Sequence, residues 1–368
     1  MSEKIKRLEV DSDLKKMALK FLDDIENNQD EFVFPVVGDF IVDRYKFCKV
    51  ERKNLEHDSL ILDLVDSSCY YGGASNVANI IGTFSRCSTN KNVNFYLGCG
   101  KEDPLYLQRI NLFDPSTFNL SIYCDQNYDR VIPVKTRLIG VNRNEYLGRI
   151  DNEPTRATFP KLSDDIALHI GQDINKLYSN VIFISDYNKG FISPELLDTV
   201  YNGEAGEIMA YCNIRPKRIP YYIERMHALS FNKTEFIQTY EILFDEIIDI
   251  ISLDNVKQLK DSLMVENIII TFGGNGFIYC GEHDCCVKVD PLRNLSTNSK
   301  NIIGAGDMVS AAFAFFSSMN YHFFLAKYDI RVILHLVNCS AFLKVYTGEY
   351  TVNFDLLKSY LNGNLCLF

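Results

Sequence analysis

Short apolar runs recur along the chain, and each is bounded by Gly, Asp or Asn. They are Phe32–Val37, Val93–Leu97, Val181–Ser185, Ile208–Cys212 and Ile268–Phe272. Helical patterns lie between several of these runs, for example at residues 193–201 and 250–264. Because short runs without polar alternation are typical of strands buried on both faces, the pattern predicts a mostly parallel sheet with helices on both sides. We therefore expect an α/β fold with three layers, α/β/α.

Composition and charge narrow the class of protein. Hydrophobic residues make up 47% of the 368 residues and charged residues 23%, which is typical of soluble globular proteins and excludes a largely disordered chain. The formal net charge is -10, and an acidic surface repels nucleic-acid backbones and anionic membranes. The charged N-terminus and the lack of an apolar run of ~18–20 residues predict a cytoplasmic protein without a leader or a membrane span.

The 11 cysteines are scattered, and free thiols are the simplest expectation in a reducing cytoplasm. One cluster runs from Cys280 to Cys286, with His283 between them. It could bind a metal, although no second Cys-x-x-Cys or His pair supplies the distant ligands of a usual zinc site. The alternative, which we favour, is a strand–turn–strand with buried thiols.

Two stretches, residues 44–71 and 120–150, are rich in polar residues that are compatible with strands. They lie between elements of the main sheet and predict a small β-sheet lid, which would exclude water from a reacting group. Ordinary surface hairpins are the alternative. Residues 1–30 carry a helical pattern and predict an N-terminal helical extension, so that residues 31–368 would form the main domain.

A glycine-rich turn, Gly304-Ala305-Gly306-Asp307, precedes a segment that is apolar on every face. A helix that begins there leaves backbone N–H groups without intrahelical partners, and its dipole favours an anion such as phosphate. Asp307 would repel that anion unless its charge is used. A general base that accepts a proton from an attacking hydroxyl is the use that fits. A plain glycine-rich turn with Asp307 as a cap is the alternative.

This turn resembles the C-terminal signature of the ribokinase-like (PfkB) carbohydrate kinases, and residues 72–78 resemble their N-terminal signature. The similarity extends over about residues 32–350, and residues 38–45, 135–151 and 185–190 are similar to the kinase domain of bacterial heptose-7-phosphate kinases. The resemblance implies a kinase that uses ATP and Mg²⁺ to phosphorylate a sugar or sugar phosphate, most closely a heptose 7-phosphate. It further implies that Asp307 is the base, that Gly304, Ala305 and Gly306 form an anion hole, and that lids pair two subunits in a homodimer.

The resemblance also implies sugar-binding residues at strand ends and in the lid. Asp39 and Asp43 could accept hydrogen bonds from sugar hydroxyls, and Asn76 offers both a donor and an acceptor. Lysine and arginine side chains could hold a substrate phosphate. A turn carboxylate, a solvated helix amide and a charged surface hairpin are the respective alternatives. The implied substrate-binding set is Asp39, Asp43, Gly72, Gly73, Asn76, Lys135, Arg137, Arg143, Asp186 and Lys189.

A second implied set would bind the nucleotide. Residues 232–235 resemble the family's Asn-x-x-Glu element, in which Glu235 could order Mg²⁺ through water, and a helix cap is the alternative. Residues 271–276 follow a strand at its carboxyl end, where open α/β sheets bind ligands. Asn338 resembles a residue that lines the adenine pocket, with a buried core amide as the alternative. The implied set is Asn232, Glu235, Thr271, Gly273, Gly276 and Asn338.

Two positions depart from the family pattern. Asn301-Ile302-Ile303 stands where a carboxylate and a hydroxyl usually precede the glycine turn, which places a monovalent-cation site in doubt. Arg215 replaces the first residue of an expected Asp-Pro-Lys. A non-catalytic regulator that binds ATP or a sugar without turnover is therefore the second hypothesis. An NAD-binding oxidoreductase is disfavoured because Gly-x-Gly-x-x-Gly does not follow the first strand.

Overall fold

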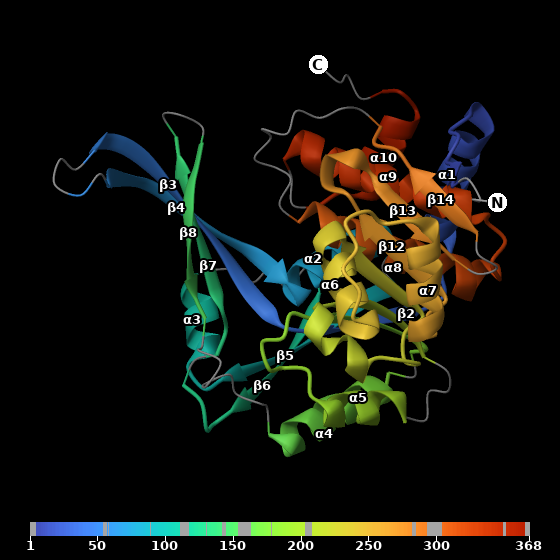
Figure 1. The fold of residues 1–368 in the computed structure, drawn as a ribbon. Helices are drawn as coiled ribbons and strands as arrows, with labels where there is room; N and C mark the ends of the chain where they lie inside the picture. Colours follow the sequence, from blue (N-terminus) through green and yellow to red (C-terminus); the bar gives the residue numbers. More distant parts are fainter. Residues whose placement is uncertain are drawn as a thin grey trace.

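The computed structural model describes most of the chain, and Figure 1 shows a main body with a separate small sheet beside it. The described residues are 5–53, 57, 59–88, 90–110, 118–129, 131–141, 145–153, 163–177, 179–202, 208–281, 285–292, 304–348 and 351–364. The predicted α/β class, with a mostly parallel main sheet and a second smaller sheet, is confirmed.

The main sheet has ten strands in the order β1-β14-β13-β12-β11-β10-β9-β2-β5-β6. Adjacent strands are parallel throughout, except that β13 is antiparallel to both of its neighbours. The strands are β1 (Lys6–Arg7), β2 (Phe32–Gly38), β5 (Lys91–Gly100), β6 (Asn119–Asp125), β9 (Val181–Asp186), β10 (Met209–Ile214), β11 (Ala228–Asn232), β12 (Asn267–Thr271), β13 (Phe277–Cys280) and β14 (Cys286–Val289).

Successive side chains of the central strands enter different cores on the two faces of this sheet. In β9, Phe183 packs into one core, whereas Ile182 and Ile184 pack into the other. This explains why the strands read as unbroken apolar runs. The first core is covered by α1 (Ser12–Asn27), α2 (Ala74–Ser85), α8 (Ala305–Phe324), α9 (Ile330–Thr347) and α10 (Phe354–Leu361), and the second by α4 (Asp164–Asn175), α5 (Pro194–Tyr201), α6 (Lys233–Phe244) and α7 (Leu253–Leu263).

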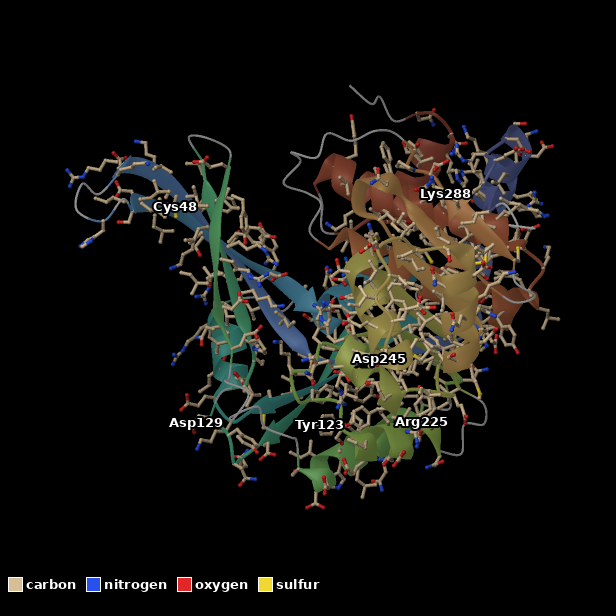
Figure 2. The ribbon with its side chains drawn as sticks, viewed as in Figure 1. Cys48, Tyr123, Asp129, Arg225, Asp245 and Lys288 are labelled. Atoms are coloured by element: carbon tan, nitrogen blue, oxygen red, sulfur yellow. A yellow bond between two sulfur atoms is a disulfide. The ribbon has the colours of Figure 1, made fainter. Side chains whose placement is uncertain are left out.

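The small sheet has four strands in the order β4-β3-β7-β8. It projects from one side of the main body (Figure 1), and Cys48 of β3 lies well away from the main sheet (Figure 2). A side chain on Gly38 would overlap the carbonyl oxygen of Ser185, so glycine permits the close approach where β2 leads into β3. The strands of this lid sheet are β3 (Phe40–Lys53), β4 (Leu60–Gly73), β7 (Val134–Gly140) and β8 (Glu145–Asn152).

The two stretches predicted for the lid behave differently. In the first, residues 44–53 lie in β3 and residues 60–71 lie in β4. In the later part of the second, residues 134–140 lie in β7 and residues 145–150 lie in β8. The start of the second stretch does not lie in the lid sheet, because β6 pairs with β5 at the edge of the main sheet. Tyr123 of β6 donates a 2.5 Å hydrogen bond to Asp173 of α4. An edge strand and a lid strand share the same polar, β-compatible composition, which is why the sequence did not separate them.

The N-terminal extension packs onto the main body. β1 pairs with β14, and α1 contributes Leu14, Phe21 and Ile25 to the first core, beside α9 and α10. α9 is the one described helix long and apolar enough to cross a membrane by composition, and 67% of it is buried inside this core.

The described part of the cysteine cluster lies in the expected pair of strands, β13 and β14, and Cys285 beside β14 is a free thiol, but the other two cysteines are not. Cys280 and Cys286 face each other in the antiparallel register and are joined by a disulfide. Cross-strand neighbours bring their Cβ atoms close enough for this bond. His283 lies outside the described residues, and within the described ones no group of His, Cys, Asp and Glu could hold a metal.

Candidate active site

The glycine turn stands at the start of α8, where the sequence places an anion site. Gly304 has φ +77°, in the left-handed region that favours glycine, and no described side chain caps the helix. The N–H of Met308 makes the first helical bond, to the carbonyl of Gly304. Ala305 and Gly306 line an open pocket, so the first turn of α8 faces the space where a ligand could bind.

Asp307 accepts hydrogen bonds from three side chains that come from distant parts of the chain. Asn76 of α2 donates to Oδ2 at 2.8 Å, whereas Tyr187 and Asn213 donate to Oδ1 at 3.0 and 3.3 Å. Burial raises the pKa of the Asp307 carboxyl, and the hydrogen bonds from Asn76 and Tyr187 oppose that rise. Three donors fix the carboxylate in place and stabilise its charged form, as a general base requires.

Asn76 is buried, and only one of the two polar atoms of its side-chain amide has a hydrogen-bond partner among the described residues. Its Nδ2 donates to Asp307, but its Oδ1 is buried without a hydrogen-bond partner among the described residues. A buried acceptor without a donor is unfavourable. A ligand hydroxyl beside Asp307 would supply that donor.

A second region of the site is an open pocket of about 170 Å³ at the carboxyl end of β12. It brings together four of the residues predicted for the nucleotide, Thr271, Gly273, Gly276 and Asn338, with the first turn of α8. Gly276 must be glycine, because its φ is +81° and a Cβ would overlap the carbonyl oxygen of Val289. Asn338 lines the pocket and also donates a 2.9 Å bond to the carbonyl of Asp290. It is therefore a satisfied amide, and its contact with an adenine stays a prediction. The apolar lining was not predicted from the sequence: Phe277, Pro291, Leu292, Val309, Ala341, Phe342 and Val345.

The chain is similar to known proteins at low sequence identity. No family model matches the sequence. The Bifunctional protein HldE of Campylobacter jejuni is 26% identical over 332 residues, which covers 88% of this chain and 64% of the relative. The protein of the same name from Helicobacter pylori is 25% identical over 284 residues, covering 75% of this chain and 56% of the relative. The chain thus spans less than two thirds of the length of these relatives.

Solved structures decide the fold. Phosphofructokinase-2 from Escherichia coli in complex with fructose-6-phosphate has a TM-score of 0.65 at 12% identity, over 91% of this chain and 100% of that one. Ribokinase from Thermotoga maritima has a TM-score of 0.62 at 13% identity, over 90% and 99%. This chain has the ribokinase-like fold. A structure of the same Escherichia coli enzyme in complex with potassium has a TM-score of 0.63 at 11% identity, over 91% and 100%.

Within this ribokinase-like fold, two carboxylates predicted to bind sugar are occupied by the protein itself. Asp39 is buried and accepts backbone N–H bonds from Tyr187, Lys189 and Phe191, at 2.7, 3.0 and 3.3 Å. Burial and the charge of Asp186 raise the pKa of Asp39 to about 7. Both oxygens of Asp39 therefore hold the loop that follows β9, and that loop carries Tyr187.

Asp186 has three partners of its own in the same loop and beyond it. Arg218 Nε and the Tyr222 hydroxyl donate to its Oδ2 at 2.8 and 2.7 Å, and the Asn188 N–H donates to its Oδ1 at 2.8 Å. Arg218 and Tyr222 belong to the segment around a short 3₁₀ helix, Pro216–Tyr221. Asp186 thus ties this segment to the end of β9.

The predicted cations gather where the lid meets the main body, and most of them pair with carboxylates. Arg137 bonds to Asp43 at 2.5 Å, and Lys189 pairs with Glu153. Burial lowers the pKa of Lys135, although Glu153 and Asp43 oppose this. Arg143 lies outside the described residues.

The two N-terminal signature glycines support the same corner. A Cβ on Gly72 would lie 2.9 Å from Asp43 Oδ2, and one on Gly73, whose φ is +60°, would lie 2.5 Å from the carbonyl oxygen of Asp39. These glycines therefore let β4 enter α2 against the start of β3.

Two residues that the sequence reasoning missed link these groups. Tyr187 donates to Asp307, while Lys135 and Arg215 lie over its ring, 5.8 and 4.7 Å from the centroid. Asn213 stands at the end of β10. Tyr187 lies inside the motif at residues 185–190, and that motif could have identified it as a site residue. No motif in the sequence indicates a role for Asn213.

Glu235 does not offer an open carboxylate to a metal. It forms a capping box with Asn232, whose backbone N–H donates to Oε2 at 3.0 Å, and its Oε1 pairs with Arg215. Both oxygens are therefore engaged. These residues do not fit a magnesium ion held by side chains, and we derive no step from one.

Proposed function

We propose that the chain transfers the terminal phosphoryl group of ATP to a hydroxyl of a sugar or sugar phosphate. The observation that carries the proposal is Asp307. It is a carboxylate held by three donors at the start of α8, directly beside the pocket that Ala305 and Gly306 line. A base and an anion site stand side by side, which is what hydroxyl attack on a phosphoryl group needs.

Each part of the site then has one task. The acceptor hydroxyl donates to Asp307, and a second hydroxyl of the substrate donates to the Oδ1 of Asn76. As its oxygen bonds to the γ-phosphorus, the bond from that phosphorus to the bridging oxygen breaks, ADP leaves with the electron pair, and Asp307 takes the hydroxyl proton. The N–H groups of Ala305 and Gly306, with the helix dipole, stabilise the negative oxygens of the migrating group.

The nucleotide in this proposal is ATP. The adenosine would lie against Gly273, Gly276 and Asn338, with its phosphates directed toward Gly306. The apolar lining suits a flat base, and the carboxyl ends of parallel strands are the usual place for such a ligand. Mg²⁺ would enter bound to the phosphates of ATP.

The finer substrate we propose is the anomeric hydroxyl of a heptose 7-phosphate. The similarity to HldE and the motifs at 38–45 and 185–190 support it. Lys135 and Arg137 of the lid strand β7, together with Lys189 of the loop after β9, would bind the distal phosphate of such a substrate.

We further propose a cytoplasmic homodimer that forms through the lid. Large apolar side chains of the lid strands are exposed, among them Leu64 at 57% and Val65 at 60%. An exposed patch of apolar side chains on a four-stranded sheet is typical of a protein–protein interface. Val65→Asp tests this proposal below.

Asp307→Asn tests the proposed reaction. The change keeps size and hydrogen-bonding capacity, so the fold and the affinity for ATP should stay close to those of the parent. Turnover should fall about 10²–10⁴-fold, because the proton acceptor is lost. Asp355→Asn, the same change in the first turn of α10, is the matched control and should leave turnover unchanged.

Release of ADP across a panel of sugars and sugar phosphates is the assay. The raised pKa of Asp307 predicts that the acidic limb of the parent's activity lies above the ordinary range of an aspartate, because only the ionised form accepts a proton. A folded Asp307→Asn variant that keeps more than about a tenth of the parent's turnover would rule Asp307 out as the base. A parent that binds ATP but releases no ADP with any acceptor would favour the regulator instead.

A further inference from the structure

Lys344 is a buried lysine that the proposed reaction does not yet use. It lies in the last turn of α9 and is only 3% exposed. Lysine is rarely buried to this extent, because removing its charge from water is unfavourable unless an opposite charge compensates. A lysine in the last turn of a helix commonly serves the helix dipole at the surface, which does not require burial.

The end of the Lys344 side chain lies against the glycine turn at the start of α8. A Cβ built on Gly304 would lie 3.4 Å from Lys344 Cε and 3.8 Å from Nζ, and 3.1 Å from Asn76 Nδ2. The ammonium group and the Asn76 amide therefore flank the same residue. Burial lowers the pKa of Lys344, and the charge of Asp307 opposes this, so the two charged groups act on each other.

Negative charges gather at the site, and the Lys344 ammonium would offset them. Asp307 and Asp43 are close enough for Asp43 to raise the pKa of the Asp307 carboxyl. The γ-phosphate of ATP would bring further negative charge to the same place. Arg137 and Lys189 are paired with Asp43 and Glu153. A positive group directly at the turn would stabilise both the ionised base and the migrating phosphoryl group.

We propose that the Lys344 ammonium is a built-in cation at the start of α8, which positions and stabilises the transferring phosphoryl group so that no free monovalent cation is needed. The inference rests on the proposed kinase function and names a further residue of that site. Phosphofructokinase-2, a structural neighbour, is described in complex with potassium. This chain carries Asn301 and Ile303 before the glycine turn and a lysine beside it.

The first experiment measures binding of ADP alone and of ADP with aluminium fluoride, a mimic of the transferring phosphoryl group, to the full chain. Lys344→Met should bind ADP like the parent but lose about 100-fold in affinity for the aluminium fluoride complex. Lys344→Arg should keep part of that affinity, because the charge is retained. Lys91→Met is the matched control: Lys91 is also buried, donates a 2.8 Å bond to the carbonyl of Asn28, and lies at the amino end of β5. It should bind both ligands like the parent.

The second experiment needs no variant and covers the case in which Lys344→Met fails to fold. Binding of the aluminium fluoride complex by the parent is compared in potassium, sodium and tetramethylammonium salts, and equal affinities are expected. A potassium requirement of tenfold or more in the parent, or equal binding of the complex by folded Lys344→Met and the parent, would overturn the inference. Neither readout needs a sugar. A parent that binds the complex but phosphorylates no acceptor would therefore refute the kinase proposal while the role of Lys344 is still decided.

Discussion

Replacing Asp186 by Asn distinguishes a structural carboxylate from a sugar ligand. Asp186 is 2% exposed and accepts from Arg218, Tyr222 and the Asn188 N–H, all within 2.8 Å. Asn keeps the size but has a single acceptor oxygen. Whichever way the amide turns, one buried donor loses its acceptor and Arg218 loses its counter-charge.

The magnitude follows from these contacts. Breaking a buried ion pair by removing one partner typically costs about 3–5 kcal/mol. That is a large share of the roughly 5–15 kcal/mol by which a folded protein is stable. At this chain length it corresponds to a fall of roughly 4–7 °C in melting temperature. Turnover should fall as well, because the same loop positions Tyr187 against Asp307.

Urea unfolding and thermal melting followed by circular dichroism measure the effect. Asp198→Asn is the matched control: Asp198 pairs with Arg225 at 2.7 Å, but both side chains are more than a third exposed, so the change should cost under about 1 kcal/mol. In the double variant with Arg218→Met, part of the lost stability should return, since the unpaired guanidinium is gone. If Asp186→Asn is as stable as the parent and instead raises the KM for the sugar, Asp186 is a substrate ligand and the reasoning is wrong.

Two further changes test other parts of the molecule. Glu235→Gln should leave the Mg²⁺ dependence of turnover unchanged. It should lower the free energy of unfolding by about 1 kcal/mol, because Glu235 caps α6 and pairs with Arg215. If the variant instead needs a higher Mg²⁺ concentration for turnover, Glu235 is a magnesium residue. Val65→Asp in the lid should convert a dimer to a monomer, as measured by size-exclusion chromatography with light scattering. Ile250→Asp changes an exposed apolar residue outside the lid strands and should leave the dimer intact. Identical elution of Val65→Asp and the parent would count against the lid interface.

The fold could be predicted from the sequence because burial on both faces leaves a direct signal in each strand. Phe183 and its neighbours Ile182 and Ile184 are apolar for two different cores, and the chain shows this without any tertiary information. The lid sheet was also visible in composition. The assignment of β6 was not, because pairing with β5 depends on where the chain returns, and composition does not encode that.

The chemistry of single residues was predicted unevenly for a related reason. Asp307 and the pocket glycines are local to recognisable turns, so their places follow from the motif. Asn213 reaches Asp307 only because β10 lies beside β9 in a register that pairs Asn213 with Ser185. Strand order is a property of the whole sheet.

Charge pairing bears on how an acidic chain would hold a phosphoryl group in the proposed reaction. The net charge is -10, yet four carboxylates near the site are matched by cations: Asp43 with Arg137, Glu153 with Lys189, Glu235 with Arg215, and Asp186 with Arg218. Charges elsewhere on the surface are screened over about 8 Å at physiological salt. In the proposed reaction, the ligand would therefore meet mainly the start of α8, Lys344 and Asp307. A hydroxyl that gives up its proton and a phosphate that needs positive charge would each find the group they require within one turn of helix.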